Sequence, residues 1–125
     1  MQSSTTKNCP CQGATLVRFV QPIILSTLSR GPSHGHLLLE KIACTRLWGG
    51  SPPDPAGVYR TLRGMEQRGL ISSRQTVGMG RGPARRLFAL TPAGELCCRK
   101  WLCTLRQYRL GLDEVISFLE EMGEV

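Results

Sequence analysis

A chain of 125 residues with 41% hydrophobic and 20% charged residues has the composition of one globular domain. Its formal net charge of +7 favours an anionic partner, nucleic acid before a membrane surface, and no run approaches the ~20 apolar residues of a membrane span. The first 13 residues lack the apolar core of a secretory signal, so we expect a cytoplasmic protein whose six cysteines stay reduced.

The predicted elements begin after a polar tail over residues 1–13. Residues 14–30 carry a broad apolar face and predict a helix, which Pro22 either kinks or divides into a loose first turn and a firm second half. Gly31 and Pro32 end this helix. We expect Ser33 to cap a second helix over residues 34–47, followed by a turn rich in glycine and proline.

A third helix is predicted from Asp54 to Arg68. Asp54 is a good N-cap, and Pro55 occupies the first helical position, where a missing N–H costs nothing. Apolar residues recur at 58, 62 and 65 and form one stripe, and Gly69 is suited to a left-handed C-cap. A helix, a short turn and a second helix make the helix-turn-helix arrangement, whose second helix enters the major groove.

A β-hairpin with a Gly-rich tip follows this helix, its second strand running from residue 85 to residue 90. Residues 56–86 hold seven arginines and one glutamate, which gives this segment +6 of the chain's +7. Arginine pairs bidentately with phosphate or guanine, so a helix carrying Arg60 and Arg63 beside an Arg-rich wing predicts a winged-helix DNA-binding surface. A basic face without a partner is the simpler alternative.

The last predicted element is one helix over residues 92–122. Its apolar residues step by 3 and 4 in turn, which is the pattern of a helix packed along another helix. We expect Leu105, Tyr108, Leu112, Val115 and Leu119 to lie at a homodimer interface, although the helix could instead fold back on its own core. Gly111 weakens the helix near its middle, so the pattern is compatible either with a straight helix or with a bend at this residue.

Three blocks of this chain resemble the PadR family of bacterial transcriptional regulators: ILSTLSRGPSHGHLLLEKI at 24–42, GVYRTLRGMEQRGLI at 57–71 and GRGPARRLFALTPAG at 80–94. The resemblance covers roughly residues 16 to 122. It implies a winged helix-turn-helix with a C-terminal dimerisation helix. It also implies a homodimeric repressor of a promoter, relieved by a small ligand.

The resemblance assigns roles to individual residues. The family's phosphate-contacting tyrosine corresponds to Tyr59, the glycine before it to Gly57, and the basic residues after the wing's Gly-Pro to Arg85 and Arg86. With Arg81 at the wing tip, these residues and the two arginines of the helix form the predicted DNA-binding set. The chain departs from the family at Arg60, often proline there, and at His36, often tyrosine.

Trp101 is a large, flat side chain on the predicted interface helix, where it either stacks a planar effector or simply fills the interface. A Cys-x-Cys pair at 9 and 11 and a Cys-Cys pair at 97 and 98, on different sides of a helix, leave a metal- or redox-responsive regulator as an alternative. A winged-helix protein-interaction module that meets an acidic partner is another. No catalytic set or cofactor motif appears, so we expect neither an enzyme nor a resident cofactor.

The sequence therefore predicts a mainly α fold with a small β-hairpin, a winged helix-turn-helix joined to a long C-terminal helix. We assign residues 1–13 to a flexible tail, 14–91 to the DNA-binding domain and 92–125 to the dimerisation helix. The expected partners are double-stranded DNA, as an inverted-repeat operator, and a second copy of the chain, with no membrane.

Overall fold

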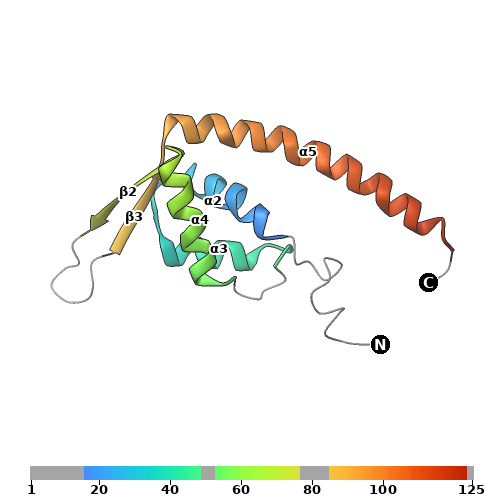
Figure 1. The fold of residues 1–125 in the computed structure, drawn as a ribbon, viewed down its shortest axis with the longest axis horizontal. Helices are drawn as coiled ribbons and strands as arrows, with labels where there is room; N and C mark the ends of the chain where they lie inside the picture. Colours follow the sequence, from blue (N-terminus) through green and yellow to red (C-terminus); the bar gives the residue numbers. More distant parts are fainter. Residues whose placement is uncertain (1–15, 49–52, 77–84, 124–125) are drawn as a thin grey trace.

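The computed structural model describes residues 16–48, 53–76 and 85–123. Helices dominate these residues, and a small sheet lies at one end of the molecule (Figure 1). In chain order the elements are η2 (Leu16–Phe19), α2 (Val20–Leu28), β1 (Ser33–His34), α3 (Gly35–Cys44), α4 (Pro55–Gln67), β2 (Ile71–Thr76), β3 (Arg85–Leu90) and α5 (Pro92–Glu120). The fold is a winged helix followed by a long helix, as the sequence predicts.

The first predicted helix is divided at Val20. A short 3-10 turn, η2, precedes α2, and Pro22 lies in the first turn of α2, where its missing N–H breaks no intrahelical bond. The division into a loose turn and a firm helix is therefore confirmed, and Pro22 fits into α2 without interrupting it. Buried side chains of α2, α3, α4, β2 and β3 form one core: Val20, Ile24, Leu25, Leu28, Leu38, Ile42, Val58, Leu62, Met65, Ile71 and Phe88.

The sequence prediction for α4 is confirmed. Asp54 caps the helix, and its carboxylate accepts a hydrogen bond from the Gly57 amide at 3.2 Å. The apolar stripe is buried, which turns the arginine-bearing face of α4 away from the core. Gly69 has a φ of 77°, the left-handed conformation that ends the helix with little strain only for glycine.

The sheet has three antiparallel strands in the order β1-β3-β2, rather than the two of a simple hairpin. The prediction that Ser33 caps the second helix is wrong. Ser33 lies in β1 opposite Phe88, while the N-cap position of α3 belongs to His34, which makes no side-chain capping bond. The backbone of Ser33 and His34 pairs with β3, a long-range contact that local capping preferences do not reveal.

The junction between the wing and α5 is rigidly built around Thr91. Its hydroxyl lies 2.6 Å from the carbonyl oxygen of Gly69 and 2.9 Å from that of Leu70, and it accepts from the Gly94 amide at 3.0 Å. Gly94 is buried, and a Cβ at this position would lie 2.6 Å from Leu90 Cδ1 and would also collide with the Leu70 carbonyl oxygen. The end of α4 and the start of α5 are therefore locked together.

Helix α5 is continuous from Pro92 to Glu120 and is not interrupted at Gly111. Its first part packs on α2, and its C-terminal half extends past the rest of the described chain (Figure 1). Cys97 and Cys98 are both partly buried and pack against the core. None of the helices in the described ranges is both long and apolar enough to cross a membrane.

Candidate nucleic-acid interface

Helix α4 presents a polar face on the side opposite its buried stripe. Arg60 and Arg63 are exposed and lie three residues apart, so their side chains leave the helix on the same side, together with Gln67. Each arginine carries five N–H donors in a planar fork. This face offers donors that suit base edges or phosphates, and using them would not disturb the core.

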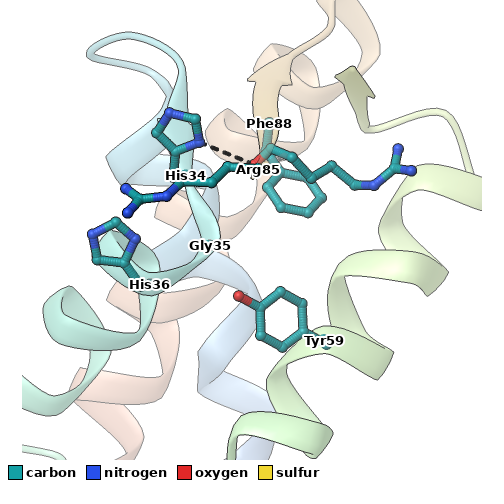
Figure 2. A pocket seen from close by; sticks show the side chains of 7 residues that line it. His34, Gly35, His36, Tyr59, Arg85 and Phe88 are labelled. Carbon is teal, nitrogen blue, oxygen red and sulfur yellow. Dashed lines mark hydrogen bonds between the residues drawn. The ribbon is translucent and has the colours of Figure 1, made fainter. Parts of the chain in front are cut away.

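A hollow of about 450 Å³ lies beside α4, where four elements meet (Figure 2). His34 lines it from β1, Gly35 and His36 from the start of α3, Tyr59 from α4, and Arg85, Arg86 and Phe88 from β3. The two imidazole rings are stacked with centroids 6.5 Å apart. Two arginines, two histidines and a phenol around one open hollow make a surface suited to a phosphate group.

Tyr59 is 40% exposed and packs closely against Gly35 (Figure 2). A Cβ at position 35 would lie 2.8 Å from two carbon atoms of the Tyr59 ring and would also collide with its hydroxyl oxygen. Glycine at 35 is thus what allows the ring to lie against the first turn of α3. By contrast, a Cβ on Gly57 would meet only ordinary contacts at 3.4 Å or more, so that glycine has no steric requirement.

The two arginines at the start of β3 differ in their surroundings. Arg86 Nη1 donates to Ser73 Oγ at 2.9 Å, and the Ser73 hydroxyl donates to Glu66 Oε2 at 2.8 Å. This chain ties the wing to α4 and occupies part of the Arg86 guanidinium. Arg85 is exposed, and its carbonyl oxygen accepts from the Thr76 hydroxyl at 3.0 Å. Arg81, predicted at the wing tip, lies outside the described residues.

His34 helps to fix the base of the wing. Its Nδ1 lies 3.3 Å from the carbonyl oxygen of Arg86, so the ring donates from that nitrogen (Figure 2). His36 is exposed beside it. Neither histidine belongs to the DNA-binding set that the sequence predicts. Their shared hollow with Tyr59 depends on β1, which sequence reasoning did not identify.

Trp101 is fixed within its own chain. Its indole Nε1 donates to Gln21 Oε1 at 2.7 Å, and its ring packs against the core. Phe19 lies edge-on to Trp101 with ring centroids 6.5 Å apart and edge-on to Tyr108 at 6.3 Å. An aromatic cluster therefore joins η2, α2 and α5 at the edge of the exposed part of α5. Sequence reasoning identified Trp101 but not its partners Gln21 and Phe19.

The cysteines within the described ranges do not gather into a site. No group of three or more His, Cys, Asp or Glu side chains suited to a metal ion occurs among those residues. Burial raises the pKa of the Cys98 thiol above its ordinary value, and the nearby Cys97 and Glu95 raise it further. A raised pKa disfavours the reactive thiolate. Cys9 and Cys11 lie outside the described residues.

The fold and this basic surface define a winged-helix protein with the architecture of a transcription regulator. The sequence profile of the transcriptional regulator PadR-like family matches residues 24–100, more than half of the chain. The chain belongs to this family, whose members are regulators of transcription and not enzymes. No curated protein sequence matches the chain.

Solved structures share the fold at low sequence identity. A proposed transcriptional regulator from Thermoplasma acidophilum is 24% identical with a TM-score of 0.72, covering 82% of this chain and 94% of that one. A PadR family regulator from Eggerthella lenta is 23% identical, with a TM-score of 0.68 and coverages of 95% and 98%. Bacillus subtilis PadR in complex with operator DNA is 21% identical with a TM-score of 0.59, covering 68% of this chain and 46% of that one.

Proposed function

We propose that this regulator binds a DNA operator in the cytoplasm with α4 in the major groove and the wing on the sugar-phosphate backbone. The observation that carries this proposal is the exposure of Arg60 and Arg63 beside the hollow that contains Tyr59 and Arg85. Arginines on the helix can read guanine, while the hollow offers donors to phosphate. Gly57, Arg81 and Arg86 complete the contact surface.

Salt-dependent binding distinguishes this function from its main alternative, a module that docks on an acidic protein. Affinity for duplex DNA should fall steeply with salt, because each neutralised phosphate releases counterions. A specific operator should also be preferred over random duplex by ~10³ or more. A protein-interaction module would bind DNA with only a weak dependence on salt and would show no preference for a specific operator.

We infer that the regulator acts as a homodimer through α5. Many large apolar side chains on this helix are exposed in the single chain: Leu96, Leu102, Tyr108, Leu110, Leu112, Val115, Ile116, Phe118 and Leu119. So large an apolar surface on one helix favours an interaction site. The predicted interface residue Leu105 is partly buried, and the remaining four are exposed. A two-fold dimer would favour an inverted-repeat operator.

The dimer is tested by substituting Leu112, which is 59% exposed in the single chain. Leu112→Asp would bury a charge in the interface, and should give a monomer with much weaker operator binding. Sedimentation velocity at micromolar concentration measures the mass, and anisotropy of labelled operator measures the affinity. A wild-type protein that is monomeric and still binds its operator tightly would contradict the dimer.

We further propose that the regulator is a repressor and that it responds to a small molecule. Repression follows if the bound dimer blocks a promoter. A planar effector would stack near Trp101, Phe19 and Tyr108, where the aromatic cluster meets the exposed part of α5. An effector that shifts the paired α5 helices would change the spacing of the two α4 helices, since Thr91 locks α5 to the end of α4.

A further inference from the structure

The charges of α5 are divided between its two halves. Residues 99–109 carry Arg99, Lys100, Arg106 and Arg109, a charge of +4, and residues 113–121 carry Asp113, Glu114, Glu120 and Glu121, a charge of −4. Glu95, in the first turn, is the one acidic residue that precedes the basic segment. No basic residue occupies the last turn. This order opposes the helix dipole, which favours cations near the C-terminus. The acidic C-terminal end therefore gains no stability from the dipole of its own helix.

Four of these charges lie on one side of the helix. Arg99, Arg106, Asp113 and Glu120 are spaced by seven residues, or nearly two turns, and all four are exposed. We call them the charge stripe. Its two outer members and its two inner members share one midpoint, between residues 109 and 110. The stripe is therefore self-complementary when a second copy runs in the opposite direction about that point.

The neighbouring apolar residues have nearly the same symmetry. We call the apolar residues that step by 3 and 4 the apolar seam: Cys98, Trp101, Leu105, Tyr108, Leu112, Val115 and Leu119. Leu102 and Ile116 are each about half exposed, lie between this seam and the charge stripe, and have their midpoint at residue 109. In the first half of α5 the seam is already covered, because Cys98 and Trp101 pack on the chain's own core. A partner helix must therefore approach on the flank that carries Leu102 and the stripe.

We propose that the charge stripe sets the direction and register of an antiparallel α5 pair between two copies of this chain. Arg99 faces the partner's Glu120 and Arg106 faces the partner's Asp113, and the two-fold axis repeats both pairs. A parallel pair would instead place equal charges opposite one another. The stripe thus favours one alignment over others, the usual role of charges beside an apolar interface. This inference rests on the proposed homodimer.

A charge-swap experiment tests the proposal. Arg106→Asp alone and Asp113→Arg alone each create two repulsive pairs in the dimer, and each should raise the dimer dissociation constant about tenfold. The double variant, with both changes, restores two attractive pairs and should return to within about threefold of the wild type. Glu114→Arg is the matched control, since it lies ~100° around the helix from Asp113 and should leave the constant unchanged.

A distance measurement tests the direction independently. Ala93 is exposed on the first turn of α5 and can carry a spin label introduced without cysteine chemistry. The antiparallel register places the two Ala93 residues about 50 Å apart at 1.5 Å per residue. A parallel pair places them about 10 Å apart. Circular dichroism confirms that each variant is folded.

The outcomes separate this inference from the proposed function. A double variant no tighter than the single variants, or a short distance between labels in a stable wild-type dimer, overturns the charge-stripe register and leaves the homodimer intact. A wild-type chain that is monomeric overturns both. Rescue by the double variant together with the long distance supports the register.

Discussion

The indole nitrogen of Trp101 donates to the side-chain oxygen of Gln21 at 2.7 Å and so ties α5 to α2. The ring also packs on the core, which means that Trp101 has a structural role in each single chain. An effector that stacks on this cluster would act on a residue that already positions α5. Structural and sensing roles can then be separated by the choice of substitution.

Trp101→Phe should keep an aromatic ring but remove the hydrogen bond to Gln21 and part of the indole's packing. We expect it to lower the free energy of unfolding by about 1 kcal/mol and to retain the response to an effector. Trp101→Ala should cost ~3–5 kcal/mol and abolish the response. Chemical denaturation gives the stabilities, and a panel of planar aromatic compounds, tested for release of bound operator, gives the response. An undiminished response in folded Trp101→Ala would refute the sensing role.

Arg60 and Arg63 are expected to read the operator from the exposed face of α4. If either contacts guanine, its replacement by alanine should cost ~1–3 kcal/mol of operator affinity and relax the preference at one base pair. Binding to a library of single-base operator variants measures both effects. Arg30→Ala, an exposed arginine just after α2, is the matched control and should leave affinity nearly unchanged. Unaltered binding by both α4 variants would exclude this role for the helix.

The wing should bind the DNA backbone without base preference. Replacing Arg81, Arg85 and Arg86 together by alanine should weaken binding to all DNA sequences about equally. It should also reduce the slope of log affinity against log salt by about 0.9 for each phosphate that the protein no longer neutralises. Arg86 is partly held by Ser73, so Arg85→Ala should have the larger effect of the two β3 single variants. Weaker binding restricted to one operator would show that the wing reads sequence.

Gly35 should be essential for the position of Tyr59. In Gly35→Ala the new methyl group must displace the Tyr59 ring, so we expect stability to fall by about 1–3 kcal/mol and operator binding to weaken. Gly64→Ala is the control for stability, because a Cβ there meets nothing within 4 Å. It should stabilise α4 by about 0.5–1 kcal/mol. Thermal unfolding measures the stability of both variants. A Gly35→Ala variant as stable as the wild type would contradict the close packing of Tyr59 against Gly35.

Local signals in the sequence predicted most of this fold. Asp54, Pro55 and Gly69 specify α4 by capping and turn chemistry that acts within a few residues, and the boundaries of β3 follow from its apolar run between turns. The pairing of Ser33 with Phe88 could not be found this way, because it joins residues 55 positions apart. Ser33 is a good capping residue locally, and the tertiary contact overrides that preference.

In the candidate site, too, some features follow from local sequence patterns and others arise only from tertiary packing. The arginines of α4 are visible from composition and helical spacing, but the hollow shared by His36, Tyr59 and Arg85 exists only once α3, α4 and β3 are packed. The hydrogen bonds from Arg86 through Ser73 to Glu66 also join three elements, β3, β2 and α4. Pattern arguments identify which residue types could bind DNA, and packing decides which of them share a surface.

The cysteines offer a test of the redox alternative. Because burial raises the Cys98 pKa, its thiolate is scarce at neutral pH, and its reaction with a disulfide reagent should speed up as pH rises above the ordinary range of a thiol. In variants that retain one cysteine each, Cys98 should react at least about tenfold more slowly at pH ~7.5 than the exposed Cys103. Faster reaction at Cys98 would instead support a redox sensor.

Sequence-specific recognition of duplex DNA is the central claim, and one measurement tests it most directly. The protein is used to retain fragments of genomic DNA from its source organism, and its affinity for the tightest fragment is compared with that for a shuffled duplex of the same length and composition. At about 150 mM salt, we expect a ratio of ~10³ or more, carried by an inverted repeat. A ratio near one, with both affinities falling equally as salt rises, would contradict the claim.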